Sequence, residues 1–321
     1  MNRRYLVRRL AQLPLTVAAI LLAGFLLIHL APGDPVVALA GQSGDAEYYA
    51  YLRAKFGLDK PLPTQLVIYA GNVLSGDLGT SYVLGRPVAE AIAERLPATV
   101  LLTGSALVLS TVVGISLGIY GARRHGRWPD TAVNLTALTV YAAPVFLIGQ
   151  LVILGLALGA GWFPVEGMTD ARSSVTGLPR LLDIAHHLAL PALALTSQEV
   201  AAVARLSRVG LLDELRQDHI RTARAKGVAE GVVVRKHALR RALLPVVTVL
   251  GGRVGHLVAG AVIVEAVFGW PGLGRLLVTA MQNRDGPIVL GVFLLVAVTV
   301  VVANLLTDLL YSWLDPRVRY G

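Results

Sequence analysis

The sequence predicts an all-α, polytopic membrane protein with six transmembrane helices and a small extracytoplasmic region between helices 1 and 2. Of its 321 residues, 55% are hydrophobic and 15% are charged, and the mean hydropathy is positive, which is typical of membrane proteins. Four runs without a charged residue are each long enough to cross a hydrocarbon core of about 30 Å. These runs are 10–33, 96–122, 131–165 and 286–307.

Two further spans contain charged residues. The run 186–204 is interrupted by Glu199, and the run 242–268 is interrupted by Arg253 and Glu265. The spans then number six, and an even number places both chain ends on the same side of the membrane.

The distribution of Lys and Arg predicts which side that is. The chain ends and the loops on their side hold 19 of the 29 Lys and Arg residues in 69 positions, and the opposite loops hold nine in 113 positions. Basic loops stay in the cytoplasm, so we expect cytoplasmic termini in a bacterial or archaeal cell membrane. This topology, with some contact to membrane lipid, explains the net charge of +9 without a nucleic-acid partner.

The expected segments follow from these spans. They are an N-terminus at 1–9, TM1 at 10–31, an extracytoplasmic cap at 32–95, a core at 96–314 and a tail at 315–321. Within the core we expect TM2 at 97–122, TM3 at 131–158, TM4 at 186–206, TM5 at 241–268, TM6 at 287–312 and a cytoplasmic segment at 207–240.

Two segments allow alternative interpretations. The first apolar run follows basic residues as a secretory signal does, but its 24 residues exceed the roughly 7–15 of a signal peptide, so we expect a retained helix. The region 32–95 resembles a linker in its turn signals, but Tyr48, Tyr49, Tyr51 and Phe56 give it the aromatic content of a folded cap.

Four ionisable residues within the spans are candidates for a translocation pathway. Arg253 lies roughly 18 Å into TM5, near the membrane midplane, and His256 shares its helix face. Arg253 either lines a polar passage that attracts a carboxylate, or pairs with Glu199 or a neighbouring subunit, because a charge facing lipid is costly. Glu265 is expected to cap a loop amide near Gly269 or to line a gate.

The residues that several classes of function require are missing from the sequence. The chain has no cysteine, which removes thiol chemistry and thiolate metal sites. None of its four lysines stands in a phosphate-binding Gly-Lys-Ser/Thr motif, and zinc-protease and serine-hydrolase signatures are absent. The adjacent His186 and His187 point about 100° apart on a helix, so we expect no metal site there. Because the motifs named above are missing, we also expect no catalytic residues and no cofactor bound by this chain.

The cytoplasmic segment contains a run that alternates charged and small side chains. It reads Arg221-Thr222-Ala223-Arg224-Ala225-Lys226-Gly227. Charge can steer a partner protein, small side chains allow its surface to come close, and Gly227 can end a short helix in a left-handed cap. The alternative is a lipid-binding basic loop, which needs the charge but tolerates a large side chain at Gly227.

Several short motifs follow one another along the chain in a fixed order. They are Leu30-Ala31-Pro32-Gly33-Asp34-Pro35, Gly76-Asp77-Leu78-Gly79-Thr80-Ser81, the run 221–227, His237-Ala238-Leu239, Leu244-Pro245, Gly269-Trp270-Pro271-Gly272-Leu273-Gly274 and Asp315-Pro316-Arg317. In this order they resemble one known family: permease subunits of ATP-binding-cassette importers for dipeptides and oligopeptides, which also include nickel and glutathione systems. The similarity covers nearly the whole chain and is greatest to the first permease of the pair, dipeptide permease B-like.

This resemblance implies a transport subunit rather than an enzyme. It implies that residues 221–227, with His237 and Pro245, belong to a variant of the EAA loop, whose coupling helices sit in a groove of an ATPase subunit. Arg221 replaces the acidic residue of the general pattern, which fits the peptide branch, and Arg253 stands where a neutral polar residue is expected.

The implied partners are a second, homologous permease, two cytoplasmic ATPase subunits or one fused ATPase, and an extracytoplasmic substrate-binding protein. ATP and Mg²⁺ would be bound by the ATPases. Nickel, another metal chelate or glutathione are alternative cargoes within the family. A secondary transporter is the rival from another class, and it would couple ions through Arg253, Glu199 or Glu265.

Overall fold

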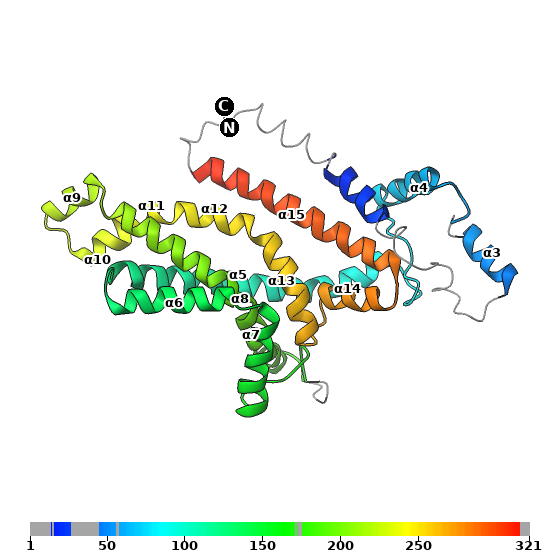
Figure 1. Cartoon of the computed structure of the whole chain (residues 1–321), viewed down its shortest axis with the longest axis horizontal. Helices are drawn as coiled ribbons and strands as arrows, with labels where there is room; N and C mark the ends of the chain where they lie inside the picture. The colour runs from blue at the N-terminus through cyan, green and yellow to red at the C-terminus, as the bar shows by residue number, and fades with distance from the viewer. Residues whose placement is uncertain are drawn as a thin grey trace. The chain divides into compact units, whose positions relative to one another are not determined.

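In the computed structural model of the chain, the described residues are 14, 16–26, 45–55, 58–170, 172 and 175–314. Over these ranges the chain forms helices and no β-strand (Figure 1), which confirms the all-α class. The chain divides into two compact units. Unit 1 consists mainly of Met1–Thr99 and Pro271–Val302, and unit 2 of Val100–Trp270 and Ala303–Arg319.

Unit 1 contains a short apolar helix, Thr16–Leu26, and three further helices that lie wholly within it. These are α3 (Ala46–Lys55), α4 (Leu62–Leu74) and α14 (Leu273–Gln282). Two long helices, α5 (Val88–Arg123) and α15 (Gly286–Leu314), have residues in both units. Because α5 begins at Val88, the last eight residues of the expected cap belong to the helix that contains TM2.

A hydrogen-bonded turn explains the Gly76–Ser81 motif. The Asp77 carboxylate accepts the N–H of Gly79 at 2.8 Å, and Gly79 has φ +81°, a conformation that favours glycine. The hydroxyl of Ser81 bonds to the carboxylate of Asp285, which is 2% exposed and also accepts the N–H of Tyr82 at 3.1 Å. The motif therefore ties the turn before α5 to the residue before α15, within unit 1.

In unit 2, the residues of the expected span TM3 form two helical parts with a sharp bend between them. Helix α6 (Trp128–Ala142) is followed by α7 (Val145–Val152) and by a π-helical stretch, η1 (Ile153–Gly159), and the two parts meet at 103°. Ala143 has ψ 133°, because the ring of Pro144 disfavours the α-helical conformation in the residue before it. The residues of the expected span TM3 therefore form a bent helix pair rather than one helix, and the span itself stays a prediction.

Helix α8 (Leu178–Glu214) extends beyond both ends of the expected TM4 and packs closely against α5. A Cβ atom at Gly114 would lie 2.6 Å from Val203 Cβ, and one at Gly118 would lie 2.6 Å from the carbonyl oxygen of Ala204. These two glycines are four residues apart and lie on one face of α5. As in other membrane proteins, small residues at this spacing allow two helix backbones to approach.

The region of TM5 is broken into shorter helices. After α9 (Asp218–Ala225) and α10 (Glu230–Val232) come a second π-helical stretch, η2 (Val233–Ala238), then α11 (Leu239–Ala242), α12 (Leu244–Gly252) and α13 (Val254–Val267). Among the described residues, α5 and the Gly286–Thr307 part of α15 are long and apolar enough to cross a membrane, and the bent α6–α7 pair is a third candidate. The number six stays a prediction.

Candidate functional site

Helix α9 contains most of the basic run and has two different faces. Ile220 and Ala223 are buried, whereas Arg221, Thr222, Arg224 and Ala225 are exposed. The buried face joins an apolar cluster with side chains of α5, α8, η2 and α11. The buried members of this cluster are Ala122, Leu211, Ile220, Ala223, Val233, Val234, Ala238 and Ala242.

The burial of Ala223 differs from the expectation that its small side chain faces a partner. With 8% of its surface exposed, Ala223 allows α9 to approach its own chain. Ala225 is the exposed alanine of the run. Ala225 and the charged side chains, and not Ala223, are therefore the accessible part of the run.

Gly227 ends α9 in the left-handed conformation that the sequence suggested. Its φ is +75°, its N–H donates to Arg224 O at 2.9 Å, and the N–H of Val228 donates to Ala223 O at 3.2 Å. These two bonds form a Schellman motif. A Cβ atom at Gly227 would meet nothing within 4 Å, so the backbone conformation, and not space, favours glycine here.

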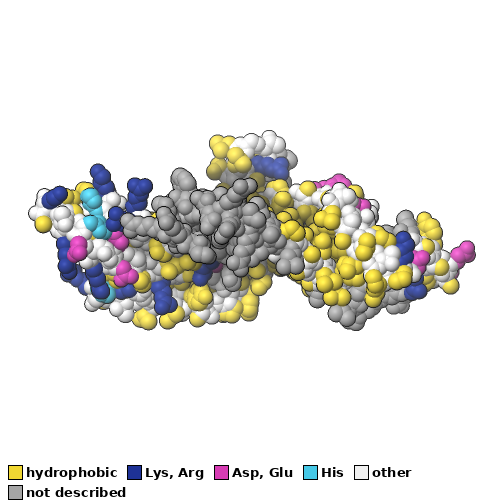
Figure 2. All heavy atoms as spheres, turned by 90° about the horizontal axis from the view of Figure 1, so that it is seen from above, with side chains coloured by type: hydrophobic (Ala, Val, Ile, Leu, Met, Phe, Trp, Pro, Cys, Tyr) yellow, Lys and Arg dark blue, Asp and Glu magenta, His cyan; other side chains and the backbone are white. Residues whose placement is uncertain are grey.

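Basic side chains gather at the end of unit 2 that contains α9 and α10 (Figure 2). Arg224 forms two hydrogen bonds to Glu230, at 2.7 and 3.1 Å, and these bonds lower the pKa of the Glu230 carboxyl against the opposing effect of partial burial. Arg221 lies 3.5 Å from Asp218, with both side chains exposed. His237 is half-buried in η2, and Pro245 is exposed on α12, so neither belongs to α9.

The four candidate pathway residues lie in unit 2, but they do not form one group. The Arg253 guanidinium lies 2.9 Å from the Glu199 carboxylate, which is one of the two arrangements considered from the sequence. Glu265 is fully buried on α13. His256 is on the same helix, and its side chain lies outside the described part of the structure.

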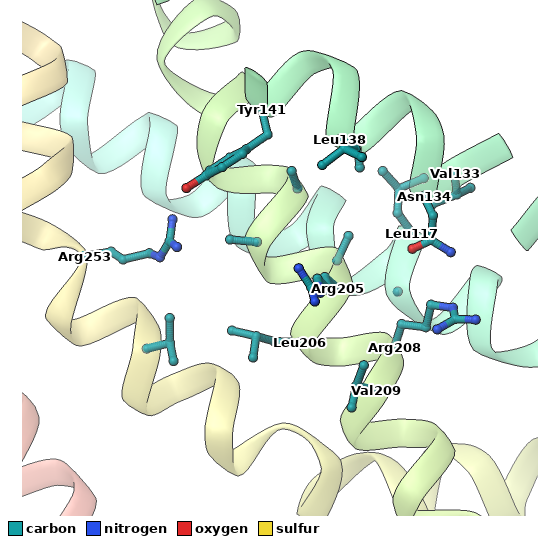
Figure 3. A pocket seen from close by; sticks show the side chains of 16 residues that line it. Leu117, Val133, Asn134, Leu138, Tyr141, Arg205, Leu206, Arg208, Val209 and Arg253 are labelled. Atoms are coloured by element: carbon teal, nitrogen blue, oxygen red, sulfur yellow. The ribbon is translucent and has the colours of Figure 1, made fainter. Parts of the chain in front are cut away.

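Arg253 also lines a pocket of about 760 Å³ in unit 2. Side chains of α5, α6, α8 and α12 form its wall, and most of them are apolar. The polar members are Asn134, Tyr141, Arg205, Arg208 and Arg253. In Figure 3 the hydroxyl of Tyr141 points towards Arg253, and Arg205 lies between Arg253 and Arg208.

A second buried ion pair was not anticipated from the sequence. Arg208 on α8 binds Asp130 in the first turn of α6 through two contacts of 2.6 Å, and Asp130 is 4% exposed. The N–H of Gly126 and the Asn134 amide also donate to the Asp130 carboxylate. The sequence feature that could have indicated this pair is that Asp130 is the single acidic residue in the basic loop 122–130.

Two family models together match nearly the whole chain. The family model described as binding-protein-dependent transport system inner membrane component matches residues 112–320. The model of the N-terminal part of such membrane components matches residues 2–103.

Two relatives are similar over almost their full length. The chain is 40% identical to the glutathione transport system permease protein GsiC of Pectobacterium atrosepticum over 98% of this chain and 99% of that protein. It is 39% identical to the probable peptide ABC transporter permease protein y4tP of Sinorhizobium fredii, with the same coverage. A chain of the inward-facing MetNI methionine ABC transporter has a TM-score of 0.57 at 18% identity, covering 70% of this chain and 96% of that one, and shares the fold.

Proposed function

Because the chain belongs to the family of binding-protein-dependent transport system inner membrane components, we propose that it forms the translocation pathway of an ATP-driven importer for di- or oligopeptides, glutathione among them. The chain is an ABC transporter permease, an integral protein of the bacterial inner membrane, and a transport subunit rather than an enzyme. The peptide cargo is supported by the names of the two relatives, one a glutathione and one a peptide permease. ATP hydrolysis is then the task of partner subunits.

The observation that carries the coupling mechanism is the two-faced helix α9. Its exposed side, with Arg221, Thr222 and Ala225, is proposed to dock on an ATPase subunit together with Lys226, which directly follows the helix. Its buried side packs into the apolar cluster that includes Leu211 of α8. Since packed interiors have little free space, displacement of α9 by closing ATPases is expected to move α8 with it.

The same helix α8 connects this movement to the pathway. Glu199 lies three turns before Leu211 on α8, and it holds Arg253 between α12 and α13. A shift of α8 therefore displaces the Glu199–Arg253 pair, which we propose borders the passage, without any chemistry in this chain. In an importer of this kind, ATP binding turns the passage outward to accept cargo.

The remaining partners follow from the same proposal. A second, homologous permease completes the passage, and α5 offers it an exposed apolar stripe, Val100, Val108 and Val112. The binding protein delivers cargo from the extracytoplasmic side, where the region 32–95 is placed. Both chain ends and α9 then face the cytoplasm, in agreement with the distribution of Lys and Arg.

The decisive experiment separates docking from folding at α9. The complex is purified with its ATPases and binding protein, reconstituted in liposomes and tested for ATP-dependent uptake of labelled dipeptide and glutathione. Ala225→Trp adds a large side chain to an exposed position, so we expect an assembled permease pair with loss of cargo-stimulated ATP hydrolysis and uptake.

The matched control is Ala132→Trp, at an exposed alanine of α6, which is expected to leave both activities unchanged. Full coupling in Ala225→Trp would show that α9 is not the docking helix. Uptake by the permease without any nucleotide-hydrolysing partner would instead contradict the import mechanism and support the secondary transporter.

A further inference from the structure

The pocket in unit 2 contains one more positive charge than the acidic residues around it can balance. Of its three arginines, Arg208 is paired with Asp130 and Arg253 with Glu199. Within the described part of the chain, Arg205 has no hydrogen-bond or ion-pair partner. Its guanidinium offers several N–H donors in the geometry that suits a phosphate or a carboxylate.

The rest of the wall suits a ligand that is mostly apolar. Side chains of α5, α6, α8 and α12, such as Leu117, Val133, Leu206 and Val249, contribute no hydrogen-bonding group. The amide of Asn134 is already engaged by Asp130. A hydrophilic peptide placed here would leave most of its backbone N–H and C=O groups without partners, which is costly in an apolar site.

The border of the pocket is also apolar and exposed. Leu138 and Tyr141 of α6 and Val209 of α8 line the pocket, and 62%, 52% and 44% of their respective surfaces are exposed. A hydrocarbon chain that approaches the pocket from this side therefore meets exposed apolar side chains of α6 and α8. The volume of about 760 Å³ lies within the roughly 300–1,000 Å³ of pockets that hold small ligands.

The position of Arg205 along α8 matches the level of a lipid head group. It lies nine residues before the end of α8 at Glu214, roughly 13 Å along the helix axis, and at the end of the expected span TM4. Basic pockets between transmembrane helices at this level bind anionic lipid head groups. On the proposed orientation, the leaflet on the α9 side is the cytoplasmic one.

We propose that this pocket binds an anionic phospholipid of that leaflet, with its phosphate on Arg205 and an acyl chain along the apolar wall between α6 and α8. The bound lipid fills a space beside the Glu199–Arg253 pair. It thereby supports the wall of the passage that α8 moves.

The test is a lipid titration of the purified complex, which requires no transport and so can fail independently of the import function. Phosphatidylglycerol is added to the complex in neutral detergent micelles, and the midpoint of thermal unfolding is followed, with phosphatidylcholine as the uncharged comparison. We expect phosphatidylglycerol to raise the midpoint of the natural protein. In Arg205→Gln we expect roughly tenfold more lipid to be needed.

Three variants control the interpretation. Arg180→Gln removes an exposed arginine from the opposite end of α8 and should leave the titration unchanged, whereas Arg205→Lys should retain most of the effect. Ala137→Phe fills the apolar part of the pocket and should weaken the lipid effect although Arg205 is intact. An unchanged titration in Arg205→Gln, or equal stabilisation by phosphatidylcholine, would overturn the proposal.

A separate assay tests the competing possibility that Arg205 binds a carboxylate of the cargo. Arg205→Gln is assayed in phosphatidylcholine nanodiscs for the cargo concentration that half-saturates ATP hydrolysis. We expect the value of the natural protein. A rise of roughly tenfold in this neutral lipid would place the cargo carboxylate on Arg205 and would contradict the lipid site.

Discussion

Unit 2 contains two kinds of ion pair, and they differ in what surrounds them. Asp130–Arg208 and Glu199–Arg253 join different helices, and each carboxylate is buried. Arg224–Glu230 lies on the surface near α9, with 42% and 54% of the side-chain surfaces exposed. Removing one partner of a buried pair leaves a charge without compensation, whereas water compensates a surface pair. The buried pairs therefore hold helices together, and the surface charges remain available to another protein.

The largest effect is expected at Arg208. Arg208→Gln leaves the Asp130 carboxylate buried without its guanidinium, so we expect a loss of about 3–5 kcal/mol of stability and a strong fall in assembled complex, measured by size-exclusion chromatography in detergent. The double variant Asp130→Asn with Arg208→Gln removes both charges and should recover much of the complex. Equal losses in the single and double variants would mean that the charge pair does not explain the effect.

A smaller effect is expected at Arg253. Its side chain is 26% exposed, so water can reach part of the site, and Arg253→Gln should cost about 1–3 kcal/mol. We expect the complex to assemble but cargo uptake in liposomes to change, because Glu199 loses the partner that holds α8 to the α12–α13 region. If assembly fails while Glu199→Gln with Arg253→Gln assembles, the pair has a structural role alone.

Variants of Gly227 test whether the exposed surface at α9 contacts another protein. Any L-residue at φ +75° is strained by about 1 kcal/mol, and a Cβ atom at this position would meet open space. Gly227→Ala and Gly227→Leu should therefore lower the midpoint of thermal unfolding equally. The leucine should reduce cargo-stimulated ATP hydrolysis much more than the alanine, because it adds bulk to the docking surface. Equal activity in the two variants would favour the lipid-binding loop.

The smallest effect concerns the surface pair itself. Since Arg224 lowers the pKa of Glu230, the pair contributes its full stability above the ordinary glutamate pKa of about 4.3 and loses it as the pH falls through the lowered value. Exposure limits this contribution to about 0.2–1 kcal/mol. The difference in hydrogen exchange of the α9 amides between Glu230→Gln and the natural chain should therefore be the same at pH 7 and at pH 5.5. It should disappear only as the pH falls through the lowered pKa of Glu230.

Local patterns in the sequence predicted local features of the structure well. Charge-free runs indicated the long helices α5 and α15, and a glycine after a short amphipathic run indicated the left-handed cap at Gly227. The bend at Pro144 was also encoded locally, but the length of the apolar run favoured one span. Asp130 and Arg208 are 78 residues apart, and no local pattern shows which distant arginine a buried aspartate will meet.

The two glycines at 114 and 118 have a mechanical consequence. Where they face α8, their backbone lies against backbone atoms and against the first side-chain carbons of Val203 and Ser207, which cannot bend away to absorb a displacement. Along this seam the helices are expected to translate as a single rod. A pull applied near α9 would therefore reach both of them with little delay or loss.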